Sequence, residues 1–130
     1  MIKALLSDSI VANLMSRCSL TQAQVDTLLL AANEELSLSA KAAHRDDGKV
    51  SKGSFIRTLR QGQANIESSI YTLFLLAYLG LIPSGRLNQF ARTGDLISKI
   101  KASEPDRASV RQLLIAMNDF ARGFSGREKP

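Results

Sequence analysis

Residues 49–82, KVSKGSFIRTLRQGQANIESSIYTLFLLAYLGLI, are the stretch that decides the fold. The stretch begins as a basic, amide-rich segment and passes into an almost wholly apolar one. Its apolar positions keep to one helical face: Phe55, Leu59, Ile66, Ile70, Leu73 and Ala77. This spacing predicts a helix over residues 54–79, about 39 Å long at 1.5 Å per residue. Gly62 leaves open a kink or a turn between two helices, and the period favours one helix.

Helical spacing continues on both sides of this segment, and no stretch shows the alternation of a strand. A first helix is predicted over residues 2–16, and Thr21 with Gln24 forms the capping box of a second. Gly80 and Pro83 end the central helix, Asp106 caps the last helix, and Gly123 stops it. We therefore expect an all-α protein: a compact bundle of five or six helices around residues 54–79, in a single domain over residues 1–124. Residues 125–130 are expected to form a flexible basic tail.

Composition narrows the choice of partners and compartment. The chain has 130 residues, a formal charge of +5 and a pI near 9.7, which favour contact with anions such as nucleic acid. Cys18 is the only cysteine, so neither an intrachain disulfide nor a cysteine-based zinc site can form. A reducing, cytoplasmic location is the expectation. The N-terminal residues read as an amphipathic helix rather than a signal peptide.

The apolar run is too short for a membrane span. Residues 68–85 carry no charge, but the strongly apolar part covers only residues 70–82. As a helix this part is roughly 20 Å long, against about 30 Å of hydrocarbon. We expect no membrane contact and a buried central helix instead.

The segment from residue 41 to residue 65 concentrates positive charge, with six basic residues against Asp46 and Asp47. Lysine and arginine neutralise phosphates, while glutamine and asparagine can read base edges. In a helix this polar stripe lies opposite the apolar face, as a groove-reading helix requires. The predicted nucleic-acid-binding residues are Lys49, Lys52, Arg57, Arg60, Gln61 and Asn65. The alternative is a solvated surface face.

The same segment resembles small archaeal DNA-associated proteins of helix-turn-helix or winged-helix character. The resemblance rests on GKVSKGSF, RTLRQ and SIYTLFLLAYLGL within residues 48–82. It implies a DNA-binding, regulatory role in transcription, with residues 49–65 as the contact segment. The chain departs from the usual helix-turn-helix pattern at Gly62, which is flanked by glutamines.

Enzymatic chemistry finds little support in the sequence. His44 is the only histidine and stands in a charged, turn-like stretch, which is typical of solvated surface. No paired carboxylates or glycine-rich elbow point to a catalytic centre. We expect no enzyme, no cofactor, no metal site and no small-molecule ligand.

The alternative to nucleic-acid binding is a helical interaction or assembly module. Ile66, Ile70, Leu73 and Ala77 step by four, three and four residues, a short heptad-like seam. A helix that is apolar nearly all round must be enclosed, either by the chain's own helices or by a second copy. A homodimer is therefore the second expected partner, beside duplex DNA.

Overall fold

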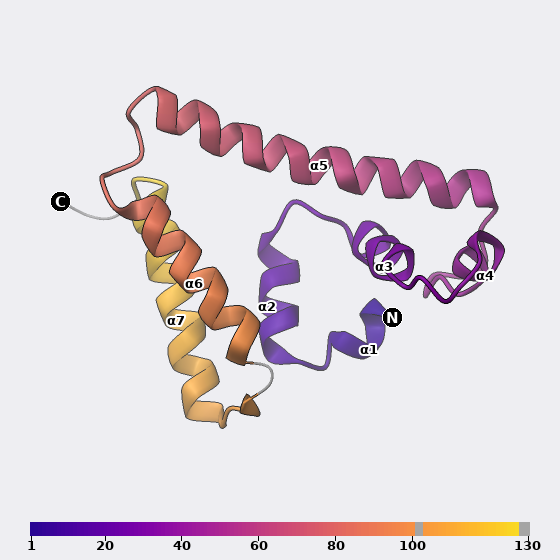
Figure 1. Cartoon of the computed structure of the whole chain (residues 1–130). Coiled ribbons are helices and arrows are strands. Elements are labelled where there is room, and N and C mark those ends of the chain that lie inside the picture. Colours follow the sequence, from indigo (N-terminus) through magenta and orange to yellow (C-terminus); the bar gives the residue numbers. More distant parts are fainter. Residues whose placement is uncertain (101–102, 128–130) are drawn as a thin grey trace. The chain divides into compact units, whose positions relative to one another are not determined.

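A computed structural model describes residues 1–100 and 103–127 and shows an all-helical chain (Figure 1). Seven helices, and no strand, occur among these described residues, against the five or six helices predicted. Their bounds are α1 Ile2–Leu5, α2 Ser9–Arg17, α3 Gln22–Ala31, α4 Leu38–Ala43, α5 Lys52–Tyr78, α6 Arg86–Ile100 and α7 Arg107–Phe124. None of the described helices is both long enough and apolar enough to cross a membrane.

The chain divides into two compact units, Met1–Thr72 and Leu73–Pro130. Helix α5 runs without interruption through the boundary. The single domain expected over residues 1–124, and the bundle expected around residues 54–79, stay predictions. Residues 128–130 of the predicted tail lie outside the described residues.

The first predicted helix, over residues 2–16, is wrong as one element because it is broken into α1 and α2. Asp8 causes the break: its carboxylate accepts hydrogen bonds from the backbone N–H groups of Ile10 and Val11. An aspartate in this role is an N-cap, which starts a new helix with an extended residue.

The core of the first unit is small. Leu30 of α3, Ala42 of α4 and Phe55 of α5 are each at most 2% exposed and form one cluster. The predicted capping box of Thr21 and Gln24 is confirmed at the start of α3. Helix α5 is therefore joined to α3 and α4 through Phe55, near its own beginning.

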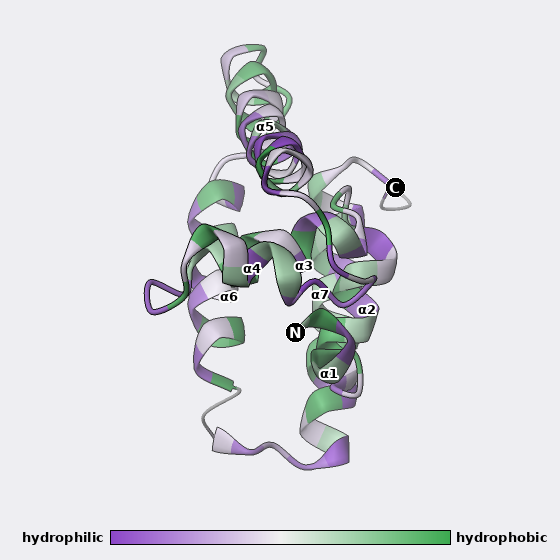
Figure 2. Ribbon diagram, turned by 90° about the vertical axis from the view of Figure 1, so that its right-hand side faces the viewer, coloured by the Kyte–Doolittle hydropathy of each residue, from purple (hydrophilic) through white to green (hydrophobic). Residues whose placement is uncertain are grey.

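The second unit contains helices α6 and α7. Hydrophilic and hydrophobic residues alternate along α6 (Figure 2). Helices α6 and α7 contact each other at a cluster of aromatic side chains. Phe90 lies 6.3 Å, between ring centroids, from both Phe120 and Phe124. Asp106 caps α7 as predicted, with its carboxylate accepting from the Ser109 N–H.

Gly123 does not stop α7, contrary to the sequence prediction. It is buried inside the last turn, and the helix ends at Phe124. The left-handed residue of the terminus is Gly126, with φ of +81°, which glycine adopts without a Cβ penalty.

Candidate interaction surface on helix α5

Ser51 sets the start of α5. Its hydroxyl accepts a hydrogen bond from the Ser54 N–H at 3.1 Å, and its carbonyl accepts from the Phe55 N–H at 2.9 Å. The first bond satisfies an N–H group that the first turn leaves without a helical partner, and the second is the first bond of the helical ladder. The helix then continues for 27 residues to Tyr78. Gly80, with φ of +71°, follows it and ends the element as predicted.

Gly62 lies inside α5 and does not break it, which decides the question that the sequence left open. A Cβ at this position would lie 3.4 Å from Leu28 Cδ1 and 3.5 Å from Gln24 Cβ, both on α3. The glycine therefore lets α3 approach the backbone of α5 closely.

Asn65 continues this attachment. Its Nδ2 donates to the Ser19 carbonyl at 2.7 Å, and its Oδ1 accepts from the Ser19 hydroxyl at 2.9 Å. The same Nδ2 lies 3.4 Å from Gln24 Oε1. Asn65 was one of the six residues predicted to contact nucleic acid, but its side-chain amide makes hydrogen bonds within the protein instead.

The other five predicted residues are solvent-exposed. Lys49 precedes α5, and Lys52 is its first residue. One face of α5 forms a shallow surface depression with a volume of about 450 Å³. Its lining residues are Gly53, Ile56, Arg57, Arg60, Gln61 and Ala64. The structure therefore brings Arg57, Arg60 and Gln61 together on one side of the helix.

Two basic residues of the 41–65 segment do not belong to this surface. Lys41 donates from Nζ to the Ala31 carbonyl at 3.1 Å. Arg45 is 7% exposed and donates from Nη2 to Asp47 at 2.8 Å, with Asp26 3.7 Å from its Nε. Both side chains hold the first unit together, so four of the six basic side chains of the segment remain for contact with an anion.

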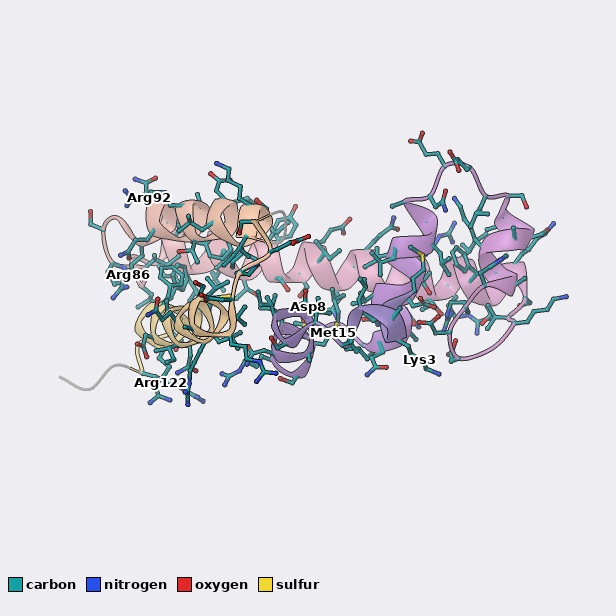
Figure 3. All side chains as sticks on the ribbon, turned by 90° about the horizontal axis from the view of Figure 1, so that it is seen from below. Lys3, Asp8, Met15, Arg86, Arg92 and Arg122 are labelled. Atoms are coloured by element: carbon teal, nitrogen blue, oxygen red, sulfur yellow. The ribbon has the colours of Figure 1, made fainter. Side chains whose placement is uncertain are left out.

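The positive charge of the chain is also distributed unevenly. Residues 1–72 carry eight Lys or Arg against seven Asp or Glu, while residues 73–130 carry nine against five. Figure 3 shows Arg92 of α6 and Arg122 of α7 pointing away from their helices. Residues 73–130 therefore carry a net charge of +4, while within residues 1–72 the acidic residues outside the 41–65 segment offset most of that segment's own excess of four positive charges.

The C-terminal half of α5 carries large apolar side chains that are exposed. Tyr71 is 70% exposed, Phe74 63% and Tyr78 90%. The predicted seam of Ile66, Ile70, Leu73 and Ala77 continues the side of α5 that Phe55 occupies. The three aromatic residues lie on the other side, where they repeat at intervals of three and four residues.

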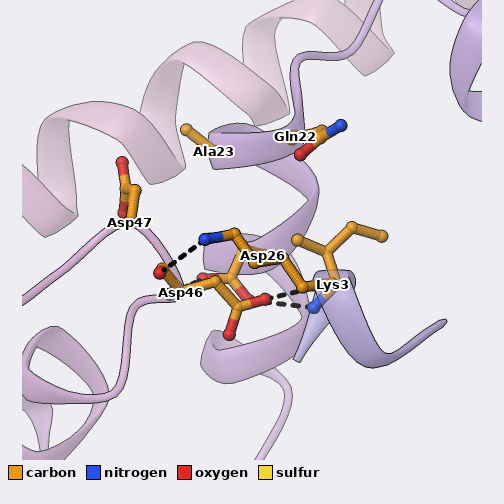
Figure 4. Close-up of a pocket in the computed structure, with 7 residues that line it drawn as sticks. Lys3, Gln22, Ala23, Asp26, Asp46 and Asp47 are labelled. Carbon is orange, nitrogen blue, oxygen red and sulfur yellow. Dashed lines mark hydrogen bonds between the residues drawn. The ribbon is translucent and has the colours of Figure 1, made fainter. Parts of the chain in front are cut away.

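Hydrogen-bonded aspartates line a small acidic pocket in the first unit, with a volume of about 160 Å³ (Figure 4). The buried Asp26 accepts from the N–H groups of Ile2 and Asp46, and pairs with the ammonium of Met1. Asp46 accepts from that ammonium and from the Lys3 N–H. These bonds lower the pKa of Asp46, with the ammonium as the main cause, and Asp46 in turn raises the pKa of the Met1 amine. The carboxylates thus tie α1 to α3 and to the loop after α4.

The remaining chemistry-bearing side chains stand apart from one another. His44 contacts the Ala40 carbonyl through Nδ1, and Cys18 is exposed. Within residues 1–100 and 103–127, no group of three or more His, Cys, Asp or Glu side chains could hold a metal ion.

No family model matches the chain, and comparison with curated proteins and with solved structures finds no match either. The resemblance to helix-turn-helix or winged-helix proteins stays a prediction.

Proposed function

We propose that this chain is a helical interaction module that binds another protein surface through the exposed side of α5. One observation carries the proposal: Tyr71, Phe74 and Tyr78 are 63–90% exposed in consecutive turns of one helix. Single exposed apolar residues are ordinary on protein surfaces, but contiguous exposed patches mark interaction sites. Tyrosine and phenylalanine are also enriched at interfaces, because they bury large areas at a low cost in conformational entropy.

The test replaces the three rings together, Tyr71→Gln with Phe74→Gln and Tyr78→Gln, and measures thermal unfolding of dilute protein by circular dichroism. Exposed side chains contribute little to monomer stability, so we expect helix content and Tm to stay within the range of surface substitutions, about 0.5 kcal/mol each. Truncating a buried aromatic residue costs about 3–5 kcal/mol. Loss of folding in the triple variant would show that these rings belong to the core and would refute the interaction surface.

Nucleic-acid binding is the second candidate, with duplex DNA as the ligand and transcription regulation as the role. The observation in its favour is that Lys49, Lys52, Arg57 and Arg60 are all exposed, while Lys41 and Arg45 are engaged internally. In this role the four cations hold phosphates, and Gln61 is the remaining side chain for base contact. Asn65 holds Ser19 instead.

A salt titration with random duplex DNA tests this candidate. Each phosphate contact contributes about −0.9 to the slope of log affinity against log salt. Arg57→Ala with Arg60→Ala should flatten the slope by nearly 2. The matched control, Arg92→Ala with Arg122→Ala, removes the same charge elsewhere and should leave the slope unchanged. Equal effects of the two pairs would show attraction to net charge alone.

Two finer predictions belong to the same proposal. A cytoplasmic location fits Cys18, which is exposed as a free thiol. The sequence predicts that other helices pack around residues 54–79. In the interaction proposal, a helix of another chain provides part of this packing.

A further inference from the structure

One stripe of exposed residues runs the length of α5. Its members follow one another at intervals of four and three residues, and every one is exposed. They are Gly53, Arg57, Arg60, Ala64, Glu67, Tyr71, Phe74 and Tyr78. We call this set the α5 stripe. Because all eight belong to one continuous helix, their alignment follows from the helical repeat alone.

The interval is that of a two-helix seam. Steps of four and three residues average 3.5 residues per turn, which keeps a seam facing a partner helix over many turns. The side of α5 opposite the stripe carries the buried Phe55 and Gly62, which face the first unit's own helices. The stripe therefore lies on the side of α5 that faces away from α3 and α4.

The stripe suits antiparallel pairing with a second copy of itself. When the second α5 runs in the opposite direction, with the twofold axis between residues 64 and 67, each stripe residue lies opposite a different stripe residue of the other copy. The four pairs are Gly53 with Tyr78, Arg57 with Phe74, Arg60 with Tyr71, and Ala64 with Glu67. The smallest residue then faces the most exposed ring, and both arginines face aromatic rings.

We infer that two copies of this chain form a homodimer through antiparallel pairing of their α5 stripes in this register. The inference rests on the proposed interaction function and names its partner. Guanidinium groups stack favourably on aromatic faces and are weakly hydrated, so arginine is suited to such an interface. The twofold axis repeats each Arg–aromatic pair, giving four in the dimer.

Charge decides the orientation of the two helices. Parallel pairing in register would set Arg57 on Arg57, Arg60 on Arg60 and Glu67 on Glu67, and like charges in contact oppose association. Antiparallel pairing separates these groups. It also brings Glu67 to within one turn, about 6 Å along the axis, of Arg60 in the other copy. Because the dimer covers Arg57 and Arg60, it excludes phosphate binding through them.

The area is of the size that a specific dimer needs. At roughly 200 Å² for each aromatic side chain, the exposed fractions of the three rings amount to roughly 900 Å² in two copies. Stable interfaces bury about 1,200–2,000 Å² in total. The remaining stripe residues and the flanking Ile56, Ile70 and Ala77 supply the difference along a helix of about 40 Å.

Disulfide trapping tests the register in full-length chains that carry Cys18→Ser. One chain has Gly53→Cys, a position where an added Cβ meets nothing within 4 Å, and the other has Tyr78→Cys. Mixing the two chains should give covalent dimers joined between positions 53 and 78. Each chain alone should give none, because like positions then lie about 37 Å apart. The collision control pairs Tyr78→Cys with Glu34→Cys, an exposed position off α5.

Sedimentation equilibrium of the unmodified chain tests the dimer itself. Phe74→Gln removes two rings from each dimer and should weaken self-association on the order of 100-fold. Leu81→Gln, which changes an apolar residue that is 62% exposed after the end of α5, should not. Homotypic disulfides, or a dimer insensitive to Phe74→Gln, would overturn the register. A 14.2 kDa species at all concentrations would overturn the homodimer. The proposed interaction surface on α5 would keep its support in that case, provided that the triple glutamine variant unfolds at the Tm of the unsubstituted chain.

Discussion

Substitution of Gly62 measures how closely α3 approaches α5. Alanine removes the helix-interior cost of glycine, about 1 kcal/mol. The new methyl group would lie 3.4 Å from Leu28 Cδ1 and 3.5 Å from Gln24 Cβ, which are ordinary contact distances. Gly62→Ala should therefore raise the free energy of unfolding by about 0.5–1 kcal/mol, since the gain in helix propensity meets little strain.

Gly62→Leu should have the opposite effect. The branched side chain extends beyond a Cβ that already touches Leu28, so α3 must move or Leu28 must leave its rotamer. Overpacking of this kind costs about 1–3 kcal/mol. For a unit of this size, each kcal/mol shifts Tm by about 4–8 °C. The two variants should thus melt on either side of the wild type.

Urea unfolding, followed by circular dichroism, is the assay, and Gly94 is the matched control. Gly94 lies inside α6, and an added Cβ there meets nothing within 4 Å. Gly94→Ala and Gly94→Leu should both stabilise their helix. If Gly62→Leu behaves like Gly94→Leu, the close approach of α3 to α5 is wrong. If Gly62→Ala destabilises by more than 1 kcal/mol, the helix does not pass through residue 62 as described.

Further predictions concern the contacts within each unit. Asn65→Ala should cost about 0.5–1.5 kcal/mol in urea unfolding, because it removes the hydrogen bonds that join α5 to Ser19, whereas Gln63→Ala should be nearly neutral. The lowered pKa of Asp46 stabilises the fold above its ordinary pKa of 3.8, and this contribution is lost as pH falls through the folded-state value. The raised pKa of the Met1 amine stabilises below 8.0, and its contribution is lost as pH rises through the folded-state value. Asp46→Asn should therefore flatten a plot of Tm against pH at both ends, and an unchanged profile would count against the ion pair. Asp106→Ala should cost about 1 kcal/mol through loss of a helix cap, and Asp106→Ser should restore most of it in the same unfolding assay.

Local signals predicted the helices well because their causes are local. The capping box of Thr21 and Gln24, the cap at Asp106 and the left-handed Gly80 depend on bonds within a few residues of each position. The break at Asp8 was missed although its signal is local too. An aspartate two residues before an apolar one reads equally well as the polar side of a continuous amphipathic helix.

The candidate site was predicted only in part, because exposure and hydrogen bonding depend on residues far apart in the chain. Arg57 and Arg60 are exposed as predicted, but Arg45 is enclosed between Asp26 and Asp47. Asn65 looked like a base-reading amide and instead holds Ser19, 46 residues away. Nothing in the local sequence distinguishes a solvated polar side chain from one with a distant partner.

The sequence by itself determined that this protein is helical, where several of its helices begin and end, and that a long helix passes through residues 54–78 without a break in its apolar face. Helical periodicity and capping are properties of neighbouring residues, so a single sequence contains them. Only the tertiary structure decided which side of α5 is covered. Phe55, Gly62 and Asn65 meet α3, α4 and the segment between α2 and α3, and this contact leaves the stripe from Gly53 to Tyr78 on the exposed side. The burial of a helix face depends on which other segments reach it, and that is settled by the packing of the chain as a whole.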